Sequence, residues 1–250
     1  MNIVEFSKPF QPISLEEMNK VKLLDRMDKK FMFNSCHLAE ILQKASEHYY
    51  ILEIDGKRYA GYDTTYFDTP EYEMYTLHHN GKQNRYKVRF RTYVDSGLSF
   101  FEVKFKTNKG RTKKSRLQLP EKDHSLTGDV AALLTRKTPY QADALVPALL
   151  VRYNRITLVN KNLTERLTID FDLNYTIGDR KASFPELVIA EVKQDRSGSS
   201  PFIDIMLDKR VRDVSISKYC LGIASLAQNV KTNNFKPKIR YVHQLFSKTA

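Results

Sequence analysis

Polar and hydrophobic residues alternate with a period of two between residues 84 and 93, in the sequence NRYKVRFRTY. One set of alternate positions is entirely basic: Arg85, Lys87, Arg89 and Arg91. Tyr86, Val88 and Phe90 fill the other set. Because side chains alternate across a strand, the pattern predicts a strand with one cationic and one apolar face. Like charges on one strand face repel each other, so we expect an anionic ligand opposite them.

The same alternation recurs in other segments that we expect to be strands. They cover residues 29–34, 51–68, 98–107, 112–119, 149–160, 165–178 and 186–195. Isolated acidic residues stand among the basic ones on the charged faces: Glu102, Asp170 and Glu191. Short turn-prone connections at 68–74, 94–97 and 107–111 favour antiparallel neighbours.

Helical periodicity appears mainly near the two ends of the chain. Residues 14–27 open with a capping box of Ser14 and Glu17 and carry Leu15, Met18, Val21 and Leu24 at helical spacing. A second helix is expected from a cap at Ser35 to residue 50, with Leu38, Ile41, Leu42 and Ala45 on one face. Residues 125–149, 201–211 and 217–228 also read as helical, and a basic tail spans 229–250. Strands outnumber helices without alternating with them, which predicts a single α+β domain over 1–250 with a large antiparallel sheet.

Composition narrows the choice of partner. Of the 250 residues, 41% are hydrophobic and the formal net charge is +12, which suggests a polyanionic partner. Cys36 and Cys220 are the two cysteines and lack metal-ligand spacing, as in a reduced, cytosolic protein. We expect neither a signal peptide nor a membrane-spanning segment.

Three arrangements of the charged strand faces are possible. An ordinary one-sided sheet would place the charges in water. A nucleic-acid-binding sheet would present aromatic residues on the charged face, whereas Tyr86, Phe90, Phe101 and Phe105 fall on the other face, so we expect no nucleic acid. A closed antiparallel barrel of about eight strands would direct the charges into its lumen and the apolar faces outward under helices. Only the barrel explains both signs of charge, because a polyphosphate with a divalent cation would bind lysines, arginines and carboxylates together.

Six ordered segments resemble the VTC (vacuolar transporter chaperone) domain, the polyphosphate polymerase domain of the triphosphate tunnel metalloenzyme (CYTH-like) superfamily. They are RYKVRFRTY, FFEVKFK, RYNR, ERLTIDFD, IAEVKQD and SKYCLG, and the similarity runs from Arg26 to Leu226. The resemblance implies a tunnel in which Mg²⁺ or Mn²⁺ assists transfer of the γ-phosphate of a nucleoside triphosphate, expected to be ATP, to polyphosphate or pyrophosphate. It also implies a possible membrane-protein partner, whereas the oligomeric state stays open.

Position by position, the resemblance assigns roles to individual residues. The catalytic residues would be Lys30, Arg89, Arg91, Lys104 and Arg166. The substrate-binding residues would be Arg152 or Arg155, together with Lys218. Further substrate-binding candidates, outside this correspondence, are Lys87, Lys106, Arg116, Lys193 and His79. Glu191 would bind metal. Glu102 would either bind metal or pair with a lumen arginine, and Asp170 would pair with Arg155 or Arg166.

Two departures and two alternative functions accompany this resemblance. The acidic motif of the first strand is reduced to Asp28, and His78 or His79 replaces an arginine. A triphosphatase in the same tunnel and a non-catalytic polyphosphate- or nucleotide-binding module are the alternatives. Product analysis with ATP and Mn²⁺ separates all three.

Overall fold

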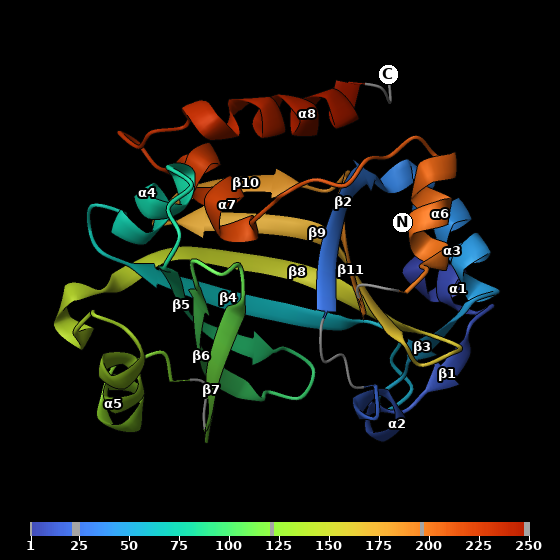
Figure 1. Ribbon diagram of the computed structural model, residues 1–250, viewed down its shortest axis with the longest axis horizontal. Coiled ribbons are helices and arrows are strands. Elements are labelled where there is room, and N and C mark those ends of the chain that lie inside the picture. Colours follow the sequence, from blue (N-terminus) through green and yellow to red (C-terminus); the bar gives the residue numbers. More distant parts are fainter. Residues whose placement is uncertain (1, 22–25, 121–122, 196–197, 248–250) are drawn as a thin grey trace.

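The computed structural model describes residues 2–21, 26–120, 123–195 and 198–247, and an eleven-stranded sheet dominates it (Figure 1). Eight strands follow one path in the order β2-β11-β9-β8-β4-β5-β6-β7. Along the chain they are β2 (Arg26–Asn34), β4 (Ala60–Asp68), β5 (Arg85–Tyr93), β6 (Ser99–Lys106), β7 (Thr112–Leu119), β8 (Val146–Asn160), β9 (Glu165–Ile177) and β11 (Leu187–Asp195). All neighbours on this path are antiparallel. The expected large antiparallel sheet is therefore confirmed.

Three short strands extend the sheet away from this path. They are β1 (Gln11–Ile13), β3 (Tyr49–Leu52) and β10 (Arg180–Phe184). Strand β10 pairs with β9 and β3 with β8, both antiparallel, whereas β1 runs parallel to β3. The N-terminal segment thus contributes a strand as well as helices.

Helices flank both faces of the sheet. They are α1 (Ile3–Ser7), α2 (Leu15–Asn19), α3 (Leu38–Ser46), α4 (Glu73–His79), α5 (Gly128–Lys137), α6 (Pro201–Asp208), α7 (Lys218–Leu226) and α8 (Lys236–Ser247), with 3₁₀ turns η1 (Ser35–His37), η2 (Ala142–Ala144) and η3 (Asn233–Phe235). Helices α1, α3 and α6 group at one end, α5 lies beside β6 and β7, and α8 crosses the molecule near the C-terminus (Figure 1).

The apolar strand faces lie under these helices, as the alternation predicts. Phe31, Ile169 and Val192 share a core cluster with Leu38 and Ile41 of α3. Beneath α5, a second core cluster joins apolar residues of β5 and β6 to the helix: Val88, Phe90, Phe101, Val103, Val130, Leu133 and Leu134. Burial of these side chains holds the strands with their charged faces turned to the other side.

The sheet is strongly curved, but its two edges are not hydrogen-bonded to each other. Strands β2 and β7 end the path, and no pairing joins them among the described residues. The edge of β2 is instead covered by residues 213–214, where the Val214 amide donates to the Lys30 carbonyl at 2.7 Å. The expected closed barrel is therefore not confirmed, because one edge is covered by the connection to α7 rather than by β7.

Helix α7 packs against the concave side of the sheet. A Cβ atom at Gly222 would lie 2.5 Å from the Tyr175 ring and 2.6 Å from Leu149, so only glycine allows this close approach. The Tyr219 hydroxyl donates a hydrogen bond to Asp68, whose carboxylate also accepts from the Met74 and Tyr75 amides of α4. Together these contacts fix α7 and α4 relative to β4, β8 and β9.

Several local expectations need correction. Asn34, not Ser35, caps the turn before α3, because its side chain accepts from the Cys36 amide. Residues 73–79, which include His78 and His79, form a helix (α4) that the sequence analysis did not predict, and the tail after residue 229 contains α8. The helical reading of 125–149 holds only through α5 and the short turn η2, since β8 begins at Val146. The capping box of Ser14 and Glu17 is confirmed, whereas Leu24 lies outside the described residues.

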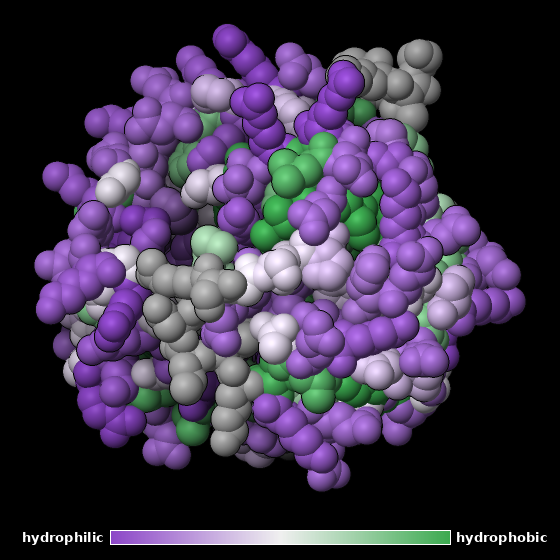
Figure 2. Space-filling model, turned by 45° about the vertical axis from the view of Figure 1, so that its right-hand side comes forward, coloured by the Kyte–Doolittle hydropathy of each residue, from purple (hydrophilic) through white to green (hydrophobic). Residues whose placement is uncertain are grey.

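The surface agrees with the excess of charge. On the face in Figure 2, hydrophilic side chains predominate and hydrophobic ones are confined to smaller areas between them. Within the part of the chain that the structure describes, every helix is too short or too polar to cross a bilayer.

Candidate functional site

Basic side chains gather on the concave face of the sheet. They come from β2, β5, β6, β7, β8, β11 and α7, and are Lys30, Lys87, Arg89, Arg91, Lys104, Lys114, Arg116, Arg155, Lys193 and Lys218. We call this set and the concave surface that it lines the cationic trough. Glu102, Asp170 and Glu191 lie among these residues and are outnumbered by them.

A row of three lysines crosses the trough on adjacent strands. The register pairs Lys87 of β5 with Lys104 of β6, and Lys104 with Lys114 of β7. Lys104 has no ion-pair partner among the described residues. The pKa of Lys104 lies well below its usual range, chiefly because of the positive charge of Arg89, followed by burial and the charge of Arg91. The carboxylates of Glu102 and Glu191 oppose this shift. Glu191 acts from β11, so the curvature of the sheet brings distant strands toward one another.

Lys87 meets the N-terminal end of α7. Its ammonium donates to the Ser217 hydroxyl at 2.8 Å, and the same oxygen accepts from the Cys220 amide as the helix cap. Burial lowers the pKa of Lys87. Cys220 is fully buried, and its sulfur lies 3.1 Å from Nδ1 of His78.

Glu102 is the centre of a buried ionic cluster. Arg89 donates to one carboxylate oxygen from Nε at 2.8 Å and from Nη2 at 2.6 Å, while Lys114 pairs with the other oxygen and Arg116 lies 3.8 Å from it. Burial alone would raise the pKa of Glu102, but the charges of Arg89, Arg91 and Lys114 hold it far below its usual range. Of the two roles considered for Glu102, metal binding and pairing with an arginine of the lumen, this geometry favours the arginine pair.

Tyrosines of β4 and β8 support the arginines from within the trough. Arg89 donates to the Tyr66 hydroxyl at 3.0 Å, and Arg91 donates to the Tyr153 hydroxyl at 2.9 Å. Arg91 also lies over the Tyr62 ring, 5.3 Å from its centre. The sequence analysis missed these tyrosines, although Tyr62, Thr64 and Tyr66 alternate in the printed sequence as a strand face would.

A second ionic cluster joins β8, β9 and α7. Arg155 donates to the two oxygens of Asp170 at 2.5 and 2.9 Å, and Lys218 pairs with the same carboxylate while lying over the Tyr153 ring. Burial alone would raise the pKa of Asp170, but Arg155 and Lys218 lower it to about 2. Of the two partners expected for Asp170, Arg155 and Arg166, the structure pairs it with Arg155.

Four expected residues lie outside the centre of the trough, and Lys106 is one of them, at the exposed end of β6. Arg152 is on the opposite face of β8, with a side chain 62% exposed and paired with Asp63 at 3.3 Å. Arg166 donates to the Met18 carbonyl at 3.0 Å, at the end near α2. His79, the last residue of α4, is buried against the C-terminal segment. Its Nε2 accepts a hydrogen bond from the Asn234 backbone amide at 3.2 Å.

Glu191 lies between two ammonium groups, Lys30 at 3.0 Å and Lys193. Burial alone would raise the pKa of Glu191, but Lys193 and Lys30 hold it well below its usual range, so the carboxylate is ionised. Among the described residues, no cluster of three or more Asp, Glu, His or Cys side chains could hold a metal by itself. Mg²⁺ commonly takes one or two carboxylates and completes its coordination with water and substrate phosphates. Glu191 fits such a single ligand, whereas Glu102, enclosed by three cations, does not.

Comparison with known proteins agrees with this geometry. The VTC domain family matches residues 25–227, which is well over half of the chain. The fold is similar to that of a putative adenylyl cyclase, HpAC1 from Hippeastrum, described as having a dominant triphosphatase activity. That likeness has a TM-score of 0.50 and 13% identity over 81% of this chain and 96% of the other.

Weaker likenesses exist to two archaeal structures. The PH1012 protein from Pyrococcus horikoshii OT3 has a TM-score of 0.38 and 11% identity, over 73% of this chain and 87% of that one. A conserved hypothetical protein from Pyrococcus furiosus has a TM-score of 0.39 and 11% identity, over 75% and 95%. No curated protein matches the chain significantly.

Proposed function

Because the chain belongs to the VTC domain family, we propose that it transfers the γ-phosphate of a nucleoside triphosphate, ATP in the first instance, to a polyphosphate chain in the cationic trough. The observation that carries the proposal is the row of Lys87, Lys104 and Lys114, with Lys104 lacking an acidic partner among the described residues. Such a row is unfavourable while empty and is stabilised by an anion of several charges.

Positioning and charge neutralisation account for most catalysis of phosphoryl transfer. Arg89, Arg91 and Lys104 would bind the triphosphate, and Arg155 and Lys218 would bind the acceptor chain. An oxygen of the acceptor's terminal phosphate forms a bond to the γ-phosphorus while the bond from that phosphorus to the β–γ bridging oxygen breaks. The nucleoside diphosphate leaves with that oxygen, and no side chain acts as nucleophile.

Glu191 would hold a divalent cation that arrives with the triphosphate, Mg²⁺ or Mn²⁺. When bound, this ion neutralises charge on the phosphate oxygens. Lys30 and Lys193 contact the same carboxylate, and they keep it ionised and oriented.

The three carboxylates of the trough and His78 are poor candidates for the general base that an attacking water needs. Glu102, Asp170 and Glu191 are all ion-paired, and the pKa of each is lowered. The pKa of His78 is lowered to about 2, mainly by burial and then by the charges of Lys87 and Arg85. Groups with such low pKa values are poor general bases near pH 7. An acceptor phosphate is already anionic and needs no base, whereas an attacking water must lose a proton.

The product of ATP turnover tests the proposal against its two alternatives. Protein is incubated with γ-labelled ATP, Mn²⁺ and pyrophosphate, and long chains are separated from orthophosphate on a gel. We expect label in chains longer than the acceptor. Label in orthophosphate alone would identify a triphosphatase, and salt-sensitive binding without turnover would identify a binding module.

Two arginines of one strand provide matched variants. Arg155→Ala removes a trough contact, whereas Arg152→Ala removes an exposed charge on the opposite face of β8. We expect polyphosphate synthesis to be lost in the first and kept in the second. Equal effects would contradict the assignment of the concave face to the phosphates.

A further inference from the structure

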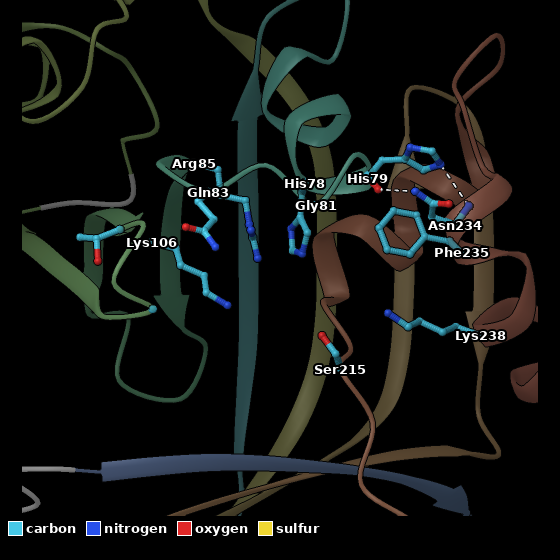
Figure 3. Close-up of a pocket in the computed structure, with 12 residues that line it drawn as sticks. His78, His79, Gly81, Gln83, Arg85, Lys106, Ser215, Asn234, Phe235 and Lys238 are labelled. Atoms are coloured by element: carbon cyan, nitrogen blue, oxygen red, sulfur yellow. Dashed lines mark hydrogen bonds between the residues drawn. The ribbon is translucent and has the colours of Figure 1, made fainter.

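A separate cavity of about 420 Å³ opens beyond the end of the lysine row. Its walls include Arg85 and Lys106 from the ends of β5 and β6, His78 from α4, Ser215 before α7, and Phe235 and Lys238 from the C-terminal segment. We call it the outer pocket. In Figure 3, Arg85 and Lys106 approach from one side and Lys238 from the other. No acidic residue lines it within the described chain.

The outer pocket continues the charge pattern of the trough. Arg85 and Lys106 are cross-strand partners, two residues beyond the partners Lys87 and Lys104 on the same strand faces. The contact of Lys87 with Ser217 lies at the transition from the trough to the pocket. An extended anion that follows β5 and β6 past Lys87 therefore meets this second group of cations next.

The electrostatic environment of His78 shows how closely these cations surround one point. Burial lowers the pKa of His78 to about 2, and the charges of Lys87, Arg85, Lys238 and Lys106 act in the same direction. Neither Arg85, Lys106 nor Lys238 has an acidic partner among the described residues. An anion in the pocket would relieve this repulsion.

The C-terminal wall is held in place by specific contacts. The Asn234 side-chain amide donates to the His79 carbonyl at 2.8 Å, and the Asn234 backbone amide donates to Nε2 of His79 at 3.2 Å. The Tyr241 hydroxyl of α8 donates to the Met32 carbonyl at 3.2 Å. Residues 234–241 lie beyond the family match, which ends at residue 227. This wall therefore lies outside the residues that match the family.

We propose that the outer pocket is a second phosphate-binding site, which holds the part of a long inorganic polyphosphate that extends past Lys87. The site rests on the proposed function, because a chain reaches it through the trough. Three cations without acidic partners suit phosphate oxygens along a chain. Tripolyphosphate is short enough to be held by the trough alone, so the pocket distinguishes long chains from short ones.

Binding to chains of two lengths tests this proposal. Affinities of the full chain for tripolyphosphate and for polyphosphate of tens of units are measured by calorimetry without ATP. For Lys238→Ala, we expect the affinity for the long chain to fall about tenfold, the size of one lost charge-assisted contact, and the long-to-short affinity ratio to fall with it. Lys238→Glu should lower the ratio further. Lys236→Ala is the matched control, because this exposed lysine of the same helix does not line the pocket.

A spectroscopic readout separates the pocket from the trough. Long polyphosphate should shift the ring signals of His78 in NMR spectra, and this shift should weaken in Lys238→Ala. Unchanged thermal unfolding of the variants checks that they are folded. If long and short chains bind alike and Lys238 variants leave the ratio unchanged, the outer pocket is not a phosphate site, although the proposed function stands. If tripolyphosphate itself does not bind, the proposed function fails first.

Discussion

Replacement of Lys104 by methionine removes one charge from the middle of the cationic trough while keeping an unbranched side chain. Lys104 is directly opposite Lys87 and Lys114 on the neighbouring strands. Favourable cross-strand pairs contribute roughly 0.2–1 kcal/mol each, and like charges directly opposite are destabilising. Taking a penalty of similar size, relief of two pairs should raise the free energy of unfolding by about 0.4–2 kcal/mol. Loss of a charged partner to a phosphate should cost about 2 kcal/mol or more of binding, which is roughly a 30-fold weaker affinity.

The stability effect has a defined pH dependence. The folded-state pKa of Lys104 lies below the model-compound value of 10.5, so the unfolded chain binds more protons in the interval between the two values. The stability of the native protein relative to Lys104→Met should therefore rise with pH across that interval. Below the folded-state pKa the charged lysine is present in both states, and its full unfavourable effect remains.

Urea unfolding and calorimetry with tripolyphosphate measure the two effects. Lys113→Met is the matched control, because Lys113 is exposed and alternates with Lys114 on β7. We expect Lys104→Met to be at least as stable as the native chain and to bind tripolyphosphate poorly, and Lys113→Met to change neither. Marked destabilisation of Lys104→Met, or undiminished binding, would refute the reasoning and make Lys104 a structural residue.

Three further substitutions test other parts of the account. Glu102→Gln should lower the free energy of unfolding by about 3 kcal/mol or more, because it leaves Arg89 without its buried carboxylate. In urea unfolding, the difference in stability between this variant and the native chain should shrink as the pH falls below 4.5. The reason is that Glu102, whose pKa is depressed in the folded state, contributes stability only while it is ionised. Glu191→Gln should lower Mn²⁺-dependent turnover by at least about 100-fold, because loss of a direct metal ligand costs more than loss of an outer-shell partner. Tripolyphosphate binding measured in EDTA should persist or tighten in this variant. Weaker binding would contradict a metal role. Tyr219→Phe should lower the free energy of unfolding by about 1–3 kcal/mol, because Asp68 loses a buried hydrogen bond. It should also weaken tripolyphosphate binding, because Lys218 is the neighbouring residue on α7 and depends on the position of that helix. An unchanged affinity in calorimetry would show that the position of α7 does not affect the site.

Much of this arrangement follows from alternation alone. The strand of Arg85 to Tyr93 and its neighbour with Glu102 and Lys104 are predictable because a period of two fixes which side chains share a face. The pairing of Asp170 with Arg155 was one of two options in the sequence, and the register of β8 with β9 selected it. The assignment of metal-binding and catalytic roles still depends on the family resemblance.

The structure differs from the sequence-based expectations where a feature depends on contacts between segments that are far apart in the sequence. Alternation along β8 places Arg152 and Arg155 on opposite faces, as found, but the extra residue that β9 inserts opposite them, near the left-handed Asp172, is not visible in the sequence pattern. Residues 229–250 looked like a basic tail because charged residues outnumber Phe235 of η3 and Val242 of α8, which become buried only against α4 and the sheet. Whether β2 and β7 meet depends on the curvature of the whole sheet, and residues 213–214 occupy the edge of β2 that closure would use.

A crystal structure with a non-hydrolysable ATP analogue tests the central claim most directly. The account predicts the triphosphate on the concave face, with its oxygens in contact with Arg89, Arg91 and Lys104. A triphosphate bound on the helix-covered side of the sheet, or one that leaves these three side chains without contact, would contradict it.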